Sequence, residues 1–315
     1  MFYVGIDLGG TNIKAGLVDE TGKIIAKDSV KTNSKRSYEA ILKDMAMLAL
    51  KVVKDNGADI NKDVVSIGIG SPGTPDNEKG ILVYTNNLPF RNVPMRAEIQ
   101  KYIKLPVNID NDANCAALAE SVAGAAKDVD KSITITIGTG VGSGVIINNK
   151  IYSGFNYAAP EAGHMVIVVD GELCTCGRKG CWEAYASATG LIRQTVAAIK
   201  ENPNSLINSL VDNDLSQLSA KIPFIAARQN DITGIKVVKQ YIKYLAAGLT
   251  NVINMFQPQI LAIGGGVCNE GDYLLDPLKE IVYSEVYSKE PVAQTKIVRA
   301  QMGNDAGIIG AAMLK

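Results

Sequence analysis

The sequence has no excess of charge of either sign, no long apolar run and only one histidine. Lys plus Arg and Asp plus Glu each total 32, so the formal net charge is zero. Without a basic surplus the chain has little attraction for a nucleic-acid backbone or an anionic membrane, and neither partner is expected. No segment approaches the about 20 consecutive apolar residues that a membrane-spanning helix needs. A soluble globular protein is expected.

Signals for export and for a disulfide framework are also absent. The first residues, Met-Phe-Tyr-Val-Gly-Ile-Asp, lack the charged and long apolar segments of a secretory signal. Of the 5 cysteines, three crowd into residues 174–181, and such clustering suits a metal better than disulfides. Cys115 and Cys268 stand alone in apolar surroundings and are expected to be core residues. A cytoplasmic location is therefore expected.

The two best-known nucleotide-binding motifs are missing. No lysine follows the Gly-x4-Gly spacing of a Walker A motif, and no Gly-x-Gly-x-x-Gly opens a helix after a strand. Gly138, Gly140 and Gly142 resemble part of the second motif, but a strand-like Ser-Gly-Val-Ile-Ile follows them. A Rossmann interpretation is therefore rejected.

Two stretches of the chain instead share one predicted order of elements. Each consists of strand, glycine-rich turn, strand, turn and strand: 3–8, 9–11, 13–18, 19–22 and 23–27 in the first stretch, and 133–137, 138–142, 143–147, 148–149 and 151–152 in the second. Each is followed later by an amphipathic helix and a strand that ends in glycine: 39–55 with 64–69, and 236–256 with 260–263. One such turn could merely close a hairpin, whereas three in matching contexts indicate a repeat.

The repeat predicts two α/β lobes that face each other across a cleft. The layout resembles the duplicated actin-like ATPase (ribonuclease H-like) fold of sugar kinases, Hsp70 and actin. The predicted lobes are residues 1–115, onto which a C-terminal helix at 303–315 packs back, and residues 116–302, which carry the cysteine cluster. Further helices are expected at 112–125, 183–200, 272–286 and 304–314, and residues 201–232 are not assigned.

The glycine-rich turns are candidate phosphate sites, because phosphate needs closely approaching N–H groups and a nearby cation. Gly9, Gly10 and Thr11 can offer N–H donors, Lys14 a positive charge, and Asp7 a carboxylate that holds Mg²⁺ through water. Two further turns are expected to contact ATP from the opposite wall and from the nucleoside side: Gly138, Thr139 and Gly140, and Gly264, Gly265 and Gly266.

A metal site is predicted from the most specific spacing in the chain. His164, Cys174, Cys176 and Cys181 give His-x9-Cys-x-Cys-x4-Cys, a closed tetrahedral set suited to structural Zn²⁺. A lone histidine is usually a satisfied core or surface residue, but this one lies a short loop upstream of three thiols. The ion is expected to lock the loop that carries Glu161 and Glu183.

A catalytic carboxylate is predicted where an Ala-rich helix follows a strand. Of Asp110, Asn111 and Asp112, one is expected only to cap that helix. Asp112 is chosen as the base that accepts the proton of an attacking sugar hydroxyl, because the helix N-terminus favours its ionised form. Asn111 can exchange hydrogen bonds with neighbouring sugar hydroxyls.

These motifs together resemble the ROK family of bacterial sugar kinases and sugar-responsive repressors. The resemblance rests on Asp7-Leu-Gly-Gly-Thr11, Asn111-Asp112, Glu161-Ala-Gly-His164 and Cys174-Thr-Cys-Gly-Arg-Lys-Gly-Cys-Trp-Glu183. The segment from Glu183 to Gly190 looks most like the glucokinase branch. The resemblance implies that Asp112 is the base toward the C6 hydroxyl, and that sugar hydroxyls are bound by Glu161, His164, Glu183 and Asn111, with Gly73 and Asn87 as further candidates.

The expected reaction is therefore ATP plus glucose giving ADP plus glucose 6-phosphate. Alternatives are the same chemistry on N-acetylmannosamine, N-acetylglucosamine, fructose, mannose or allose, polyphosphate in place of ATP, and a sugar-binding regulator without turnover. Repressors of the family carry a DNA-reading domain before the first strand, which is not expected here because that strand begins at about residue 3. The resemblance also implies a homodimer or homotetramer.

Overall fold

The computed structural model describes residues 1–85 and 88–314, which divide into two compact units. Unit 1 comprises Met1–Thr134, Gly144–Pro160 and Ala300–Lys315, and unit 2 comprises Ile135–Ser143 and Glu161–Arg299. The sequence-based boundary at 115 and 116 falls inside helix α3 (Asp112–Ala123), all of which belongs to unit 1. None of the helices in the described ranges is long and apolar enough to cross a membrane.

The strands form three sheets, with the orders β3-β2-β1-β4-β8, β11-β10-β9-β12-β13 and β5-β6-β7. The strands of the first sheet are β1 (Phe2–Leu8), β2 (Asn12–Asp19), β3 (Ile24–Lys31), β4 (Val64–Ser71) and β8 (Val107–Asn111). Those of the second are β9 (Lys131–Ile137), β10 (Val141–Ile147), β11 (Lys150–Ile151), β12 (Ile260–Gly264) and β13 (Lys296–Arg299). The third consists of β5 (Thr74–Asp76), β6 (Ile81–Tyr84) and β7 (Arg91–Val93).

The first two sheets repeat one topology. If the five strands of each sheet are numbered along the chain, their order across the sheet is third, second, first, fourth and fifth. β1 pairs with β2 antiparallel and with β4 parallel, and β12 pairs with β13 parallel. Parallel neighbours need a crossover segment between them. Helix α1 (Tyr38–Asp55) supplies it before β4, and helix α8 (Ile232–Phe256) has the corresponding place before β12. The predicted duplication is confirmed.

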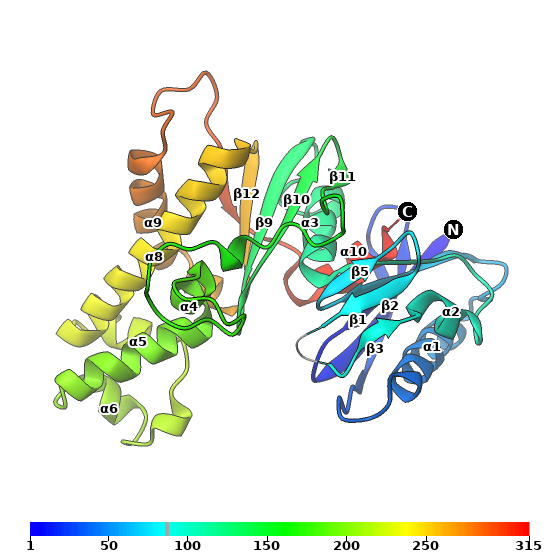
Figure 1. Ribbon diagram of the computed structural model, residues 1–315, viewed down its shortest axis with the longest axis horizontal. Helices are drawn as coiled ribbons and strands as arrows, with labels where there is room; N and C mark the ends of the chain where they lie inside the picture. Colours follow the sequence, from blue (N-terminus) through cyan, green and yellow to red (C-terminus); the bar gives the residue numbers. More distant parts are fainter. Residues whose placement is uncertain (86–87, 315) are drawn as a thin grey trace. The chain divides into compact units, whose positions relative to one another are not determined.

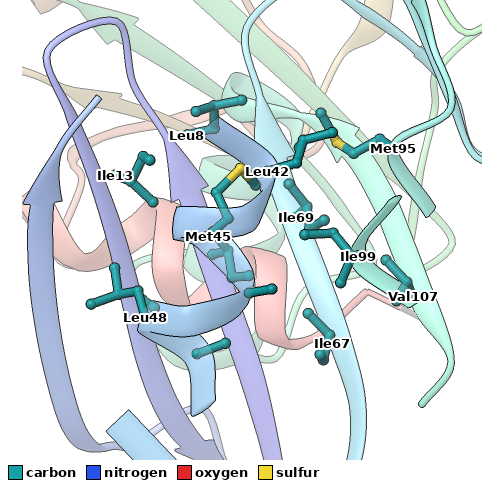
Figure 2. Packing of buried hydrophobic residues seen from close by; sticks show 14 of the residues in the cluster. Leu8, Ile13, Leu42, Met45, Leu48, Ile67, Ile69, Met95, Ile99 and Val107 are labelled. Atoms are coloured by element: carbon teal, nitrogen blue, oxygen red, sulfur yellow. The ribbon is translucent and has the colours of Figure 1, made fainter. Parts of the chain in front are cut away.

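Helix α1 covers one face of the first sheet with an apolar stripe. Its buried side chains recur with helical spacing: Ile41, Leu42, Met45, Ala46, Leu48, Ala49, Val52 and Val53. Ser37 caps the helix by accepting a hydrogen bond from the Ala40 N–H. Figure 2 shows Leu42 and Met45 packed beside Ile67 and Ile69 of β4. This face is therefore the core of unit 1.

The other face of the same sheet receives helix α10 (Ala306–Ala312) at very short range (Figure 1). A Cβ atom on Gly5 or Gly68 would overlap carbonyl oxygens of α10, those of Ile308 and Ala311. Because strand side chains alternate between faces, the residues next to these glycines point to α1 instead. The C-terminal helix was expected at 304–314, but its first turn is a 3₁₀ helix, Gly303–Asp305.

Gly68→Ala is expected to lower the free energy of unfolding by about 1–3 kcal/mol, the usual cost of overpacking a tight core contact. The added methyl group has no room because its neighbour is the Ala311 backbone rather than a flexible side chain. Urea unfolding followed by circular dichroism measures the change. Gly10→Ala is the control, since a Cβ there would meet nothing within 4 Å. Equal stability of both variants would contradict the close approach of α10.

The predicted helix over 183–200 is wrong in one respect, because the structure has two helices there. Helix α4 (Trp182–Ala186) ends one residue before Ser187, whose hydroxyl accepts the Gly190 N–H at 3.0 Å and caps helix α5 (Ala188–Glu201). The unassigned stretch after α5 contains helices α6 (Leu206–Leu210) and α7 (Ile222–Arg228) and the 3₁₀ helix Leu215–Gln217. The remaining helices are α2 (Met95–Gln100), α9 (Asp272–Glu285) and the 3₁₀ helices Ala162–His164 and Gly266–Glu270.

Candidate active site and metal centre

Three carboxylates gather at one edge of the first sheet, in unit 1. Asp7 lies in β1 and Asp110 in β8, and both are in register with Gly70 of the parallel strand between them. Asp112 follows as the first residue of α3. Because the carboxyl ends of neighbouring parallel strands meet at one edge, residues distant in sequence come together here. This is the edge at which α/β sheets bind their ligands.

The electrostatic surroundings of Asp112 hold its pKa above the usual value for an aspartate. The residue is exposed at the surface, but protein groups crowd its carboxylate, and this desolvation is the main cause of the raised pKa. The charge of Asp7 raises it further, while the Ala113 N–H, which donates at 3.0 Å, opposes the shift. Burial likewise raises the pKa of Asp110. The arrangement suits a group that must accept a proton.

Asn111 is the residue that caps α3, which settles which of the three candidates does so. Its Oδ1 accepts hydrogen bonds from the N–H groups of Ala113 at 2.8 Å and Asn114 at 3.3 Å. Its Nδ2 donates to the Gly73 carbonyl at 3.0 Å. Gly73 itself has φ +95°, a conformation that favours glycine. Asn111 therefore fixes the helix that carries Asp112 and also the loop that contains Gly73. Asn87, another predicted sugar ligand, lies outside the described residues.

The first glycine-rich hairpin brings Lys14 and Asp7 together. Lys14 Nζ lies 3.4 Å from Asp7 Oδ2 and 3.3 Å from the Asn304 carbonyl. Burial raises the pKa of Asp7, although Lys14 opposes this. The Gly9 N–H is used within the hairpin, where it donates to the Asn12 carbonyl at 3.0 Å. The exposed residues Gly10 and Thr11 are thus better placed than Gly9 to offer N–H groups to a phosphate.

The second glycine-rich turn, in unit 2, is held from outside by helix α5. The Ala188 N–H donates to the Gly138 carbonyl and the Thr189 hydroxyl to the Thr139 carbonyl, both at 2.9 Å. The Gly138 N–H donates to the Gly140 carbonyl, also at 2.9 Å. Gly138 and Thr139 are exposed, but the Gly138 N–H and both carbonyls are used in these bonds, so Thr139 is better placed than Gly138 to offer an N–H group to a ligand.

The third glycine run, Gly264–Gly266, ends β12 in unit 2. Gly264 is buried, whereas Gly265 and Gly266 are exposed. Gly265 has φ +100°, and a Cβ there would overlap the Ile137 carbonyl at the end of β9. Only glycine therefore allows this turn to lie against the strand that leads into the second glycine-rich turn.

The predicted metal ligands come together in unit 2. The ligand atoms of His164, Cys174, Cys176 and Cys181 all lie within 4.8 Å of one another. Cys176 Sγ is 3.7 Å from Cys181 Sγ, and Cys174 Sγ is 3.5 Å from His164 Nδ1. Tetrahedral zinc, with bonds of about 2.3 Å to sulfur and about 2.0–2.1 Å to nitrogen, requires edges of about 3.8 Å and about 3.5 Å. The donor set fits a structural zinc ion.

His164 presents its two ring nitrogens to different partners. Nδ1 faces Cys174 in the metal set, while Nε2 lies 4.0 Å from Glu161 Oε2. The 3₁₀ helix Ala162–His164 keeps the two residues on neighbouring turns. Nδ1 can thus bind a metal while Nε2 faces the Glu161 carboxylate.

Glu183 joins the metal loop to the second glycine-rich turn. Its Oε2 accepts the Val141 N–H at 3.0 Å, and its Oε1 lies 3.1 Å from the Thr175 hydroxyl and 3.7 Å from Cys174 Sγ. A Cβ on Gly140 would overlap the same carboxylate. Glu183 is therefore not simply a solvated charge at the start of α4. The carboxylate organises two loops, a role that its sequence position two residues after Cys181 did not reveal.

Sequence reasoning missed two residues of unit 1: Gly307, which lies against a site residue, and Glu120, a buried acid. Gly307 lies against Asp7, since a Cβ there would come within 2.7 Å of the Asp7 Cγ. Glu120 is a buried acid on the otherwise apolar face of α3. A charged residue that follows Ala113 and Ala116 at helical spacing was the available signal for Glu120; no local signal distinguishes Gly307.

Comparison with known proteins gives the family. The ROK family model matches residues 3–315. The chain is 35% identical over 315 residues to the glucokinase of Streptomyces coelicolor, covering 99% of this chain and 96% of that protein. It is 32% identical over 311 residues to the xylose repressor of Bacillus subtilis, covering 98% of this chain and 75% of the repressor.

A solved structure agrees. The ROK family glucokinase from Streptomyces griseus, in complex with glucose and AMPPNP, superposes with a TM-score of 0.83 at 34% identity, covering 99% of this chain and 98% of that one. The chain belongs to the ROK family. The topology repeated in its two sheets is the duplicated actin-like ATPase fold, as predicted.

Proposed function

We propose that this protein is an ATP-dependent kinase that phosphorylates the C6 hydroxyl of glucose. The observation that carries the proposal is the edge of the first sheet, where an exposed aspartate with a raised pKa, Asp112, lies near the Asp7–Lys14 pair of a glycine-rich hairpin. The similarity to the Streptomyces glucokinases over nearly the whole chain supports glucose as the acceptor and ATP as the donor.

In this reaction Asp112 accepts the proton of the attacking hydroxyl. A strong base is unnecessary, because phosphoryl transfer passes through a loose transition state in which positioning and charge stabilisation dominate. Asn111 supports the base by capping its helix. Glu161, His164 Nε2, Glu183, Asn111 and the Gly73 backbone hold the sugar hydroxyls, and Asn87 is proposed with them.

ATP is bound by the three glycine-rich segments. Gly9–Thr11, with Lys14 as the cation, and Gly138–Gly140 are each proposed to bind its phosphates, and Gly264–Gly266 to bind the nucleoside. Asp7 has the oxygen ligands that Mg²⁺ prefers, and Mg²⁺ would neutralise charge on the phosphates. Zinc in the His–Cys₃ set would supply rigidity rather than chemistry, because four protein ligands leave no open position.

The acid limb of the pH profile should report Asp112. Only the ionised carboxylate accepts a proton, and its pKa is raised, so kcat/KM for glucose should fall as pH drops through a value above that of an ordinary aspartate. Initial rates measured from about pH 4, close to the ordinary pKa of aspartate, up to about pH 8 give the curve. A kcat/KM that stays constant down to the ordinary pKa of aspartate would contradict a raised pKa of Asp112.

A hexose panel tests the function directly. ADP release coupled to a dehydrogenase is measured with ATP and each of glucose, mannose, fructose, allose, N-acetylglucosamine and N-acetylmannosamine. Release with glucose at the highest kcat/KM supports the proposal, and a preference for another hexose changes the substrate but keeps the chemistry. Sugar binding without ADP release would favour a regulator, the role named for the Bacillus subtilis relative. Polyphosphate in place of ATP tests the donor.

A homodimer or homotetramer in the cytoplasm is proposed on the family resemblance. Light scattering coupled to size-exclusion chromatography determines the assembly.

A further inference from the structure

We propose that Glu120 is a positioning residue for the Asp7–Lys14 pair of the first glycine-rich hairpin, an inference that rests on the proposed kinase function. Glu120 lies near the end of α3, the helix whose first residue is Asp112. Its side chain is only 1% exposed, and neither catalysis nor sugar binding as described above uses it. A carboxylate kept in such a place needs a reason, because burying a charge is costly.

The partners of Glu120 are backbone N–H groups from two separate segments. Oε1 accepts hydrogen bonds from Gln301 and Met302, both at 2.8 Å. Oε2 accepts one from Ala125, also at 2.8 Å. Among the described residues, the ion pairs include none with Glu120. Three N–H donors, rather than a cation, therefore stabilise the charge.

Only a carboxylate satisfies these three donors at once. Both of its oxygens accept, whereas a glutamine would turn an NH₂ group toward one of the N–H donors. Space is equally restricted, since a Cβ on Gly124 would overlap Glu120 Oε2. A buried donor without a partner is expensive, so the two segments are held together firmly.

The segment that bonds to Glu120 Oε1 leads directly to the Asp7–Lys14 pair. Met302 is followed by the 3₁₀ helix Gly303–Asp305, in which the Asn304 carbonyl accepts from Lys14 Nζ at 3.3 Å. Gly307, at the start of α10, packs against the Asp7 carboxylate. Residues 301–307 thus touch both members of the pair. Through Glu120 they are fixed to the same helix that begins with the catalytic base.

The simpler interpretation is that Glu120 only stabilises the C-terminal end of α3, through the hydrogen bond that it accepts from the Ala125 N–H. That role would affect stability alone. The positioning role predicts in addition a defect on the ATP side of the reaction, because a shift of about 1 Å in a group that positions substrate can cost up to 10²-fold. Glucose binding should be spared, since Gln301, Met302 and Asn304 bond to Glu120 and Lys14. The bonds of Asn111, a proposed sugar ligand in the same unit, go instead to Gly73, Ala113 and Asn114.

The experiment compares wild type, Glu120→Gln and a matched control, Glu98→Gln. Glu98 is also an acid of unit 1, only 9% exposed, but it lies on α2 and bonds to Lys101 at 2.6 Å. For Glu120→Gln we expect kcat/KM for ATP to fall by about tenfold or more, with KM for glucose within about twofold of wild type. The affinity for AMPPNP should weaken, and amide exchange in residues 300–307 should accelerate. Glu98→Gln should change none of these.

A Glu120→Gln enzyme with wild-type KM for ATP and AMPPNP affinity, and only a lowered Tm, overturns the proposal. If this variant does not fold, Glu120→Asp takes its place, because it keeps the charge and shortens the reach by one methylene. An inactive wild type refutes the kinase function instead, and the exchange rates and AMPPNP affinity then still decide whether Glu120 positions the pair.

Discussion

Replacing Asp112 by asparagine is expected to lower kcat for glucose phosphorylation by about 10²–10⁴-fold, the usual contribution of a general base, with little change in KM for glucose. Asparagine has the same shape and cannot take up the proton. The helix should stay intact, because Asn111 rather than Asp112 provides the main cap. Steady-state ADP release at saturating ATP measures the effect.

The control for this variant is Asp110→Asn. Asp110 belongs to the same group of acids, but its Oδ1 accepts from the Asn111 N–H at 2.7 Å and from Asn114 Nδ2 at 2.8 Å, bonds that an amide oxygen can keep. The control should therefore lose far less kcat than Asp112→Asn. Equal losses, or an active Asp112→Asn enzyme, would contradict the assignment of Asp112 as the base.

The same substitution should raise stability near neutral pH. A carboxyl group whose pKa is raised by folding binds its proton more tightly in the folded state, so it stabilises the fold below the unfolded pKa and that stability is lost as pH rises through the folded pKa. Asparagine avoids this loss. The Tm of Asp112→Asn should therefore exceed that of wild type at pH 7, and the difference should shrink as the pH falls.

Removing one zinc ligand should have the second large effect. Cys176→Ser is expected to lose zinc and to lower Tm by about 5–10 °C, equivalent to about 2–3 kcal/mol for a domain of this size. Activity should fall with it, because the metal loop bonds through Thr175 to Glu183, and Glu183 in turn holds the Val141 N–H of the second glycine-rich turn. Metal analysis and thermal unfolding measure both changes.

Cys268→Ser is the control for the zinc variant. Cys268 is also a free thiol of unit 2, but it is buried against the Gly264 carbonyl and lies outside the metal set. The Cys268→Ser variant should keep its zinc. Purified wild-type protein that contains no zinc, or a Cys176→Ser variant with the full zinc content, would contradict the metal site.

Local patterns in the sequence were enough for most of the secondary structure. The apolar stripe of α1 and the alternating or continuous apolar strands depend on residues a few positions apart, and the glycine-rich turns repeat the same order in both halves. The split between α4 and α5 was missed. The hydroxyl of Ser187 caps the second helix there, and a serine within an apolar-periodic segment gives no clear sign of it.

The site divides in the same way. The His–Cys₃ group could be predicted because its four residues lie within one short stretch. The place of Asp112 at the start of α3 could be predicted because a strand, a cap and a helix follow one another directly. The bonds from Asn111 to Gly73 and from Glu183 to Val141, and the contact of Gly307 with Asp7, could not. Each joins segments far apart in sequence.

The sequence alone thus determined the family and the repeated fold and supplied the candidate site residues, since these are encoded by periodicity and short motifs. The tertiary structure alone decided how those residues are held. The Glu120 carboxylate, for example, can accept hydrogen bonds from three N–H groups of two segments only after the sheet and α10 have packed together. Hydrogen bonds and close glycine contacts depend on three-dimensional distance, on which residue spacing along the chain places almost no limit.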